Sequence, residues 1–145
     1  MGNYDHLKLE NQLCFPLYAA SREMIKKYRP FLDEIELTYT QYVAMMVLWE
    51  RERCSVKELG ETLYLDSGTL SPLLKSLEAK GFITRSRSEE DERTVMVEPT
   101  LYGGEILREK ASPIPQAVGS CFDLSPEEAA TLYKLLYKIL GKSLD

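Results

Sequence analysis

The order of helical and strand patterns between residues 55 and 98 restricts the possible folds of this chain more than any other feature. Ser55, with Glu58 three residues later, forms the capping-box pattern that begins a helix, and apolar spacing carries that short helix to residue 63. After a turn of a few residues, Asp66 or Ser67 begins a second helix, along which leucines recur at helical spacing. The pattern therefore predicts two helices joined by a tight turn.

Gly81 is of a residue type that commonly ends helices, and two segments in which apolar and polar residues alternate follow it. Residues 82–87 and 94–98 alternate in the manner of short strands, and the polar residues 88–93 join them. Helix, tight turn, helix and β-hairpin in this order constitute a winged helix-turn-helix. We therefore expect a mainly α-helical fold with a small β-hairpin wing, with the winged helix-turn-helix at about residues 55–98.

Further helices are predicted on both sides of this unit. Apolar side chains recur every three or four residues over 7–32, with Pro16 near the start of that helix and Pro30 at a frayed end. Thr38 or Thr40 can cap the next helix. Residues 100–142 are also predicted to be helical, with interruptions at two prolines and a glycine. A length of 145 residues suits one domain, so we expect a single domain over residues 1–145.

Composition and charge exclude several classes of protein. No apolar run approaches the roughly 20 residues that span a bilayer, and the N-terminus lacks the apolar segment of a signal peptide, so we expect a cytoplasmic protein with no membrane partner. One histidine and three scattered cysteines predict no metal site and no cofactor. The net charge of −5 is a weak guide to nucleic-acid binding, because affinity depends on local clusters of Lys and Arg.

The second helix of the helix-turn-helix carries small hydroxyl side chains and a lysine between its leucines. Such residues suit close approach to phosphates and base edges in a major groove. An ordinary amphipathic helix also carries polar residues on its outer face, so this helix alone does not decide the function. The residues predicted to contact DNA here are Ser67, Thr69, Ser71, Lys75 and Ser76.

Three arginines lie within nine residues on the predicted hairpin: Arg85, Arg87 and Arg93. Arg93 is near the tip, where it can reach into a narrow minor groove with concentrated negative potential. Asp91 can hold the loop by local hydrogen bonds or pair with Arg93. Three glutamates of the same loop partly cancel the arginines, so the alternative is a solvated charged hairpin.

The chain resembles the MarR family of winged-helix regulators over nearly its whole length. The family's wing pattern reads Asp91-Glu92-Arg93 followed by Val95-x-Val97, while Pro99-Thr100 departs from the usual Leu-Thr. The resemblance implies a homodimer in which the N-terminal and C-terminal helices of two chains interlock. It also implies binding to a palindromic operator in double-stranded DNA.

Two segments resemble, more narrowly, the repressors that sense organic hydroperoxides. These segments are residues 9–18, around Cys14, and residues 65–74 of the second helix. The resemblance implies that Cys14 is the peroxide sensor and that Tyr28 and Tyr39 hydrogen-bond to it from the partner subunit. It further implies that Cys121 is the second thiol of a two-cysteine sensor, and that the chain is a repressor, not an enzyme.

Helix geometry supports a sensor shared between subunits. Tyr28 follows Cys14 by 14 residues on one predicted helix, which is roughly 21 Å along its axis. The two side chains cannot touch within one straight helix, but they can touch where the helices of two subunits cross antiparallel. The N-terminus of a helix favours a thiolate, the form that attacks peroxide.

Alternative functions stay open on the sequence alone. A repressor of the same fold can respond to a small phenolic or aromatic ligand, in which case Cys14 is incidental. A thiol peroxidase enzyme would need a general base that the sequence does not indicate. A protein-interaction module would use the fold without DNA.

The other two cysteines also have a structural interpretation. Cys121 can equally be a small apolar side chain in a core, and we interpret Cys54 as structural.

Overall fold

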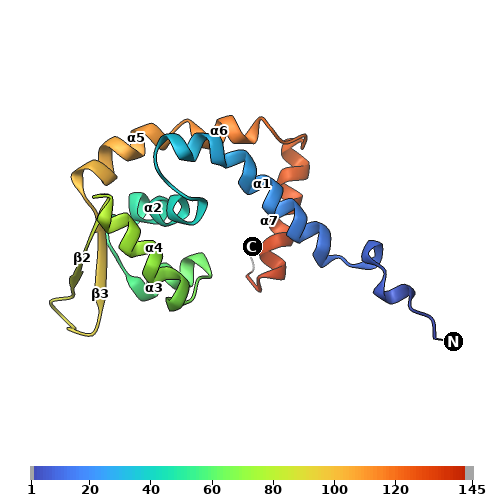
Figure 1. Cartoon of the computed structure of the whole chain (residues 1–145), viewed down its shortest axis with the longest axis horizontal. Helices are drawn as coiled ribbons and strands as arrows, with labels where there is room; N and C mark the ends of the chain where they lie inside the picture. Colours follow the sequence, from blue (N-terminus) through green and yellow to red (C-terminus); the bar gives the residue numbers. More distant parts are fainter. Residues whose placement is uncertain (1, 143–145) are drawn as a thin grey trace. The chain divides into compact units, whose positions relative to one another are not determined.

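The computed structural model describes residues 2–142 (Figure 1). The chain divides into two compact units, Met1–Ile114 and Pro115–Asp145. The first unit contains the long N-terminal helix and the winged helix with its sheet, and the second contains the C-terminal helix. The single domain over residues 1–145 stays a prediction.

The long N-terminal helix, α1, spans Cys14–Glu34 and starts seven residues later than predicted. Asp5–Leu7 and Leu9–Asn11 form two 3-10 turns instead. Side-chain amides explain the difference: Asn11 donates to the Asp5 carbonyl at 2.7 Å and Gln12 to the His6 carbonyl at 2.8 Å. These local bonds occupy carbonyls that a helix would use. The predicted fraying at Pro30 is wrong, because the helix continues past it to Glu34.

Helix α2, Tyr39–Arg51, supplies much of the core of the first unit. Thr38 caps it in a complete capping box with Gln41, which confirms the first of the two predicted caps. Its buried face includes Tyr42, Met45 and Leu48.

The helix-turn-helix consists of α3, Val56–Leu63, and α4, Ser67–Ala79. The Ser55 hydroxyl accepts from the Glu58 amide, but the Glu58 carboxylate accepts from that hydroxyl, so the predicted capping box is half formed. Tyr64 in the left-handed conformation ends α3, and Asp66 caps α4 by accepting from the Thr69 amide at 2.8 Å. The core side chains that hold the pair together are Leu59, Leu70, Leu74 and Leu77.

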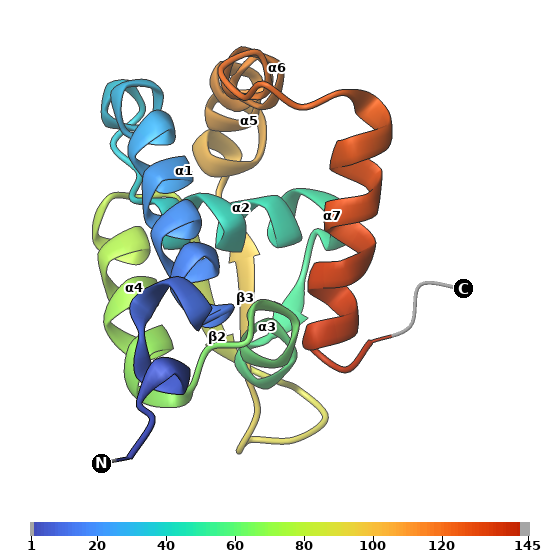
Figure 2. The same cartoon turned by 90° about the vertical axis from the view of Figure 1, so that its right-hand side faces the viewer.

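The wing is the hairpin of β2, Ile83–Arg87, and β3, Val95–Pro99, as predicted (Figure 2). A two-residue strand, β1 (Cys54–Ser55), pairs antiparallel with the other edge of β3, which gives the strand order β1-β3-β2. The sequence analysis missed β1, because two residues are too few to show alternation. Since β1 leads directly into α3, the wing is joined by backbone hydrogen bonds to the start of the helix-turn-helix.

After the sheet, a π-helical turn, η3 (Tyr102–Ile106), leads into α5 (Leu107–Ala111), and α6 spans Ile114–Gly119. The helical segment is interrupted at Pro113 and after Gly119 as predicted, but not at Pro115. Pro115 lies in the first turn of α6, where a proline needs no helical N–H partner. At the start of this segment, a Cβ added to Gly103 would lie 2.0 Å from the Phe82 carbonyl oxygen. The Gly103 carbonyl accepts a hydrogen bond from the Trp49 indole at 2.7 Å. The absence of a side chain at Gly103 therefore lets this segment lie directly against the backbone before β2.

Gly103→Ala should lower the free energy of unfolding by about 1–3 kcal/mol, because the Phe82 backbone cannot move aside without disturbing the wing. Gly104→Ala is the matched control: its Cβ would meet the Pro99 side chain at an ordinary 3.5 Å. Urea denaturation of both variants measures the difference. A Gly103→Ala variant as stable as Gly104→Ala would contradict the close approach.

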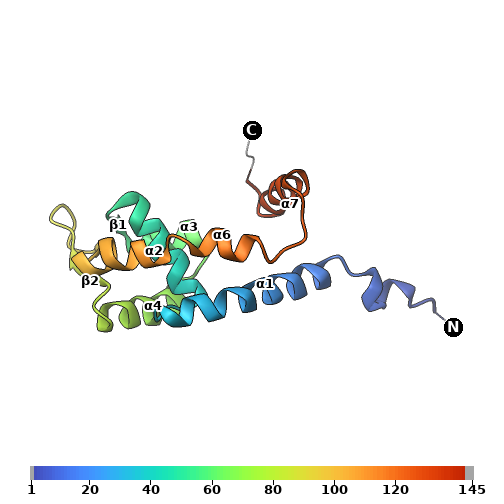
Figure 3. The same ribbon diagram turned by 90° about the horizontal axis from the view of Figure 1, so that it is seen from above.

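The apolar stripe of α1 is largely exposed in the single chain. Leu32 is the one buried residue of the helix, and Leu13, which directly precedes it, is 79% exposed. The N-terminal half of α1 extends beyond α2, α3 and α4 (Figure 3). The predicted apolar stripe therefore exists, but its first half does not contribute to the core of its own chain.

The second unit contains α7, Pro126–Ile139, which Ser125 caps in a complete capping box with Glu128. No residue of α7 is buried, and its exposed apolar side chains include Leu132, Leu135 and Ile139. No helix among residues 2–142 is long and apolar enough to cross a membrane.

Candidate nucleic-acid interface and redox centre

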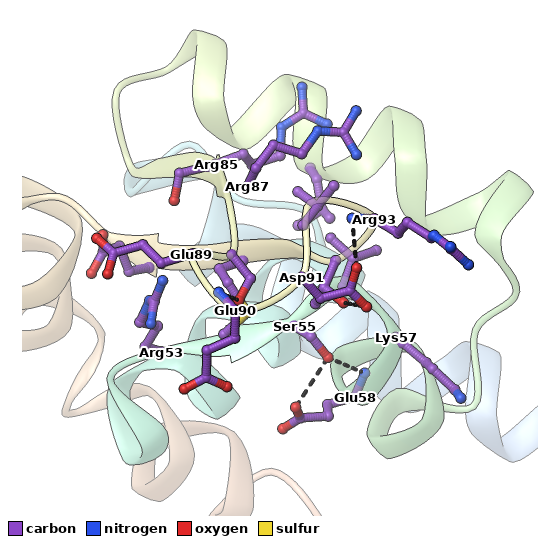
Figure 4. A pocket seen from close by; sticks show the side chains of 18 of the residues that line it. Arg53, Ser55, Lys57, Glu58, Arg85, Arg87, Glu89, Glu90, Asp91 and Arg93 are labelled. Carbon is purple, nitrogen blue, oxygen red and sulfur yellow. Dashed lines mark hydrogen bonds between the residues drawn. The ribbon is translucent and has the colours of Figure 1, made fainter.

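An open groove of about 1350 Å³ lies between the helix-turn-helix and the wing (Figure 4). α4 contributes Ser67 and Ser71 to its lining, so two of the predicted contacts lie where expected. Lys75 and Thr69 are exposed on the same helix but outside the groove lining. Ser76 is half-buried and does not line the groove, and its hydroxyl accepts a hydrogen bond from Gln41 at 3.0 Å.

The three wing arginines differ in how their guanidinium groups are occupied. Arg85 forms an ion pair with Glu78 of α4 at 3.0 Å, and this hydrogen bond lowers the pKa of the Glu78 carboxyl. Arg87 donates to the Glu92 carbonyl at 3.1 Å. The Arg93 guanidinium has no hydrogen bond or ion pair with any residue from 2 to 142. Arg85 and Arg87 therefore help to fix the wing, while Arg93 is available to a ligand.

Asp91 closes the tip of the wing by local hydrogen bonds, one of the two predicted alternatives. Its carboxylate accepts from the Arg93 amide at 3.0 Å and from the Thr94 hydroxyl at 3.4 Å, and its carbonyl accepts from the Thr94 amide. The other alternative, an ion pair with the Arg93 side chain, is absent from the described structure. Asp91 thus fixes the backbone from which the free Arg93 side chain extends.

Two basic residues that the sequence analysis missed, Arg53 and Lys57, also line the groove. Lys57 lies in the first turn of α3 and extends to the same side of the view as Arg93, while Glu89 and Glu90 point to the other side (Figure 4). The groove carries charges of both signs, and acidic side chains, Glu58 and Asp91, lie near Lys57 and Arg93 (Figure 4). The sequence does predict the cap of α3 at Ser55. That cap places Lys57 in the first turn of the helix, and this position could have identified Lys57 as a residue near the DNA.

The three thiols lie in different environments. Cys14 is exposed at the first residue of α1, and Cys121 is exposed in the segment before α7, where its thiol donates to the Ala117 carbonyl at 3.5 Å. Cys54 is 2% exposed in β1, and burial raises the pKa of its thiol. Cys54 is therefore kept neutral and shielded, which agrees with its structural interpretation.

The two predicted sensor tyrosines meet within one chain. The rings of Tyr28 and Tyr39 lie edge to face with centroids 5.0 Å apart, and Tyr42 completes the group at 5.8 Å from Tyr28. Burial, together with the two neighbouring phenols, raises the pKa of Tyr42 to about 12. We call Tyr28, Tyr39 and Tyr42 the phenol cluster. Tyr42 was missed because its sequence position indicated only a core residue.

Cys14 lies apart from the phenol cluster of its own chain. It shares α1 with Tyr28 at a separation of 14 residues, or roughly 21 Å of helix. The structure thus brings the two tyrosines together and leaves Cys14 at a distance from them, as the helix geometry predicts.

A helix-turn-helix lies beside a hairpin wing, and serine hydroxyls and basic side chains line the groove between them. This arrangement defines a winged-helix DNA-binding transcription regulator. The family model described as transcriptional regulator SarA/Rot matches residues 22–111. The chain belongs to this family of regulators, whose winged helix is of the MarR type.

Individual relatives cover nearly the whole chain. It is 53% identical to the organic hydroperoxide resistance transcriptional regulator of Bacillus subtilis, over 96% of this chain and 94% of that protein. It is 43% identical to the HTH-type transcriptional regulator SarZ of Staphylococcus saprophyticus, over 92% and 91% of the two chains.

Solved structures of AbfR, a protein of Staphylococcus epidermidis, are also similar to this chain, with 31% identity. Reduced AbfR bound to DNA superposes with a TM-score of 0.76 and covers 94% of each chain. Overoxidised AbfR bound to DNA gives the same TM-score over 94% and 96% of the chains. A disulfide-formed AbfR gives 0.65 over 94% and 95%.

Proposed function

We propose that this regulator is a homodimeric, cytoplasmic repressor that binds a palindromic operator when reduced and releases it when an organic hydroperoxide oxidises Cys14. The observation that carries the proposal is an exposed thiol at the first turn of α1, in a chain 53% identical to a regulator named for organic hydroperoxide resistance. A cytoplasmic location suits this chemistry, because the reducing cytosol keeps free thiols available for oxidation.

The exposed apolar side chains support the dimer. Leu17, Tyr18 and Met24 of α1 are exposed in the single chain, as are Leu135 and Ile139 of α7. Apolar surface of this extent is normally covered by a partner. Two α1 helices that cross antiparallel would cover their stripes and bring each Cys14 close to the phenol cluster of the other subunit.

The redox step needs only the thiol and the peroxide. The Cys14 thiolate attacks one peroxide oxygen, the O–O bond breaks, and the organic alkoxide leaves and takes up a proton to become the alcohol. Cys14 becomes a sulfenic acid, which condenses with a second thiol to form a disulfide and water. Exposed Cys121 or a small cellular thiol can supply that second thiol, whereas Cys54 is shielded.

The groove supports DNA reading in two parts. α4 would enter a major groove with Ser67 and Ser71 towards the bases, and Thr69 and Lys75 towards the backbone. Arg93 would extend from the wing into the adjacent minor groove, on a loop held by Asp91 and beside strands fixed by Arg85 and Arg87. Two subunits place two such helices on half-sites about one helical turn apart, roughly 34–36 Å.

Mass spectrometry tests the redox assignment. The reduced protein would receive one equivalent of cumene hydroperoxide, and non-reducing peptide analysis would locate each oxidised sulfur. We expect the oxygen or disulfide at Cys14, with Cys54 still a thiol. Comparison with Cys121→Ser separates the two routes: this variant should form a Cys14 mixed disulfide only when a small thiol is added. Oxidation confined to Cys121 would contradict the proposal.

Lys75→Ala should weaken DNA binding equally on all sequences, because Lys75 is assigned to a phosphate. The slope of log Kd against log salt should fall by about 0.9 for each phosphate that the variant no longer neutralises. Fluorescence anisotropy on a duplex selected from a random pool, at several salt concentrations, gives that slope. Lys27→Ala, an exposed lysine of α1, is the control and should leave the slope unchanged. A changed base preference for Lys75→Ala would show that Lys75 contacts bases.

A further inference from the structure

Gln41 is a buried polar residue, 5% exposed, and its side-chain amide is hydrogen-bonded at both ends. The carbonyl oxygen, Oε1, accepts from the Thr38 amide and from Lys80 Nζ, both at 3.1 Å. The amide nitrogen, Nε2, donates to the Ser76 hydroxyl at 3.0 Å. Capping α2 requires only the bond to Thr38, so the two bonds to Ser76 and Lys80 serve something other than the cap.

On one side, Gln41 belongs to the same helical turn as two members of the phenol cluster. Tyr39 is the first residue of α2, and Tyr42 follows Gln41 directly. Both rings contact Tyr28 of α1. Because a close-packed interior transmits strain, a displacement of the phenols that shifts the first turn of α2 also shifts Gln41.

On the other side, Gln41 is bonded to the C-terminal end of α4. Ser76 lies in the last turns of that helix, and Lys80 follows it. Lys80 Nζ also donates to the Glu36 carbonyl at 2.6 Å, at a residue with the unusual backbone angle φ of 60°. Ser71 of the groove lies five residues before Ser76, about 7.5 Å along the same rigid helix. A shift at Ser76 therefore moves the groove-facing side chains.

We propose that Gln41 is a positioning residue that transmits the displacement of the phenol cluster to α4 through its hydrogen bond to the Ser76 hydroxyl. The inference rests on the proposed function, since the phenols move only if Cys14 is the sensor. In this role Ser76, predicted from the sequence as a DNA contact, acts on DNA through the position of α4. Lys80 provides a second, weaker link, because it is exposed to solvent.

Ser76→Ala tests the link without touching the cap of α2. It removes the acceptor of the Gln41 bond, and alanine is favourable within a helix. Ser76→Thr keeps a hydroxyl and serves as the conservative variant. Ser112→Ala is the matched control, because among residues 2–142 the Ser112 hydroxyl bonds only to the Glu109 carbonyl of its own segment. For each full-length protein, anisotropy on the selected duplex gives Kd before and after cumene hydroperoxide, and peptide analysis confirms equal oxidation of Cys14.

The readout is the ratio of the oxidised Kd to the reduced Kd, which a merely structural role would not change. We expect Ser76→Ala to lower this ratio about threefold or more, while Ser76→Thr and Ser112→Ala retain it. Adding Lys80→Met to Ser76→Ala should lower it further.

Other outcomes overturn the inference in distinguishable ways. A weaker Kd for Ser76→Ala in both redox states, with an unchanged ratio, would make Ser76 a DNA contact. An unchanged ratio and unchanged Kd would remove Ser76 from the switch and leave the proposed function intact. If the unaltered protein shows no response to peroxide, the proposed function fails, and this inference fails with it.

Discussion

Cys14→Ser should retain full affinity for the operator and lose the response to organic hydroperoxide. Serine has nearly the size of cysteine, but its hydroxyl does not attack peroxide, so the reduced geometry is preserved during treatment. In the unaltered protein, oxidation should raise Kd by about 5–150-fold, the range of a typical allosteric coupling. We therefore expect less than about a twofold change for the variant on the same duplex. Anisotropy before and after cumene hydroperoxide measures both.

Two controls make this result specific. Circular dichroism should show that the oxidised unaltered protein remains helical, so that release of DNA is not unfolding. Cys121→Ser, treated in the presence of a small thiol, should still release DNA, because a mixed disulfide replaces the bridge. If Cys14→Ser released DNA on treatment as the unaltered protein does, the sensor would lie elsewhere, and regulation by a small phenolic ligand would become the better account.

Arg93→Ala should weaken operator binding by about 1–3 kcal/mol, the second of the large effects. The Arg93 guanidinium is unoccupied within the described chain, while its backbone amide is held by Asp91. Removing the side chain therefore removes a DNA contact without loosening the wing. The loss should be greater on duplexes with an A·T-rich, narrow minor groove at the wing position, where negative potential is concentrated. Binding isotherms on two duplexes that differ only at that position measure both effects.

Arg108→Ala is the matched control for Arg93, since Arg108 is an exposed arginine of α5 that does not line the groove. It should bind DNA like the unaltered protein. Asp91→Asn, by contrast, keeps an acceptor for the Arg93 amide and should lose less affinity than Arg93→Ala. Equal affinity of Arg93→Ala and the unaltered protein at low and at high salt would remove the wing from DNA recognition.

The parts of the fold that local chemistry determines were predictable from the sequence. The caps at Thr38, Asp66 and Ser125 depend on one side chain and an amide three residues away, and all three are present. The hairpin was predictable because alternation over five residues is a strong signal. The start of α1 was not predictable, because the side-chain amides of Asn11 and Gln12 donate to backbone carbonyls six residues earlier. The periodicity of a helix does not reveal such bonds.

The candidate site shows the same division. Serines at helical spacing indicated the groove-facing side of α4, and Ser67 and Ser71 do line it. The role of Ser76 depends on Gln41, 35 residues earlier, and that of Arg85 on Glu78 of another element. Tyr42 joins the phenol cluster only because α1 and α2 lie together. Contacts between distant segments leave no pattern in a single sequence.

The central claim is that oxidation of Cys14 itself lowers operator affinity in a folded dimer. It is tested most directly by titrating the DNA-bound protein with substoichiometric cumene hydroperoxide. At each step, peptide mass spectrometry would give the fraction of Cys14 oxidised, and anisotropy would give the fraction of DNA released. We predict that the two fractions rise together and that both reverse with dithiothreitol when the product is a disulfide. DNA released while Cys14 remains a thiol, or DNA retained after Cys14 has become a disulfide, would contradict the account.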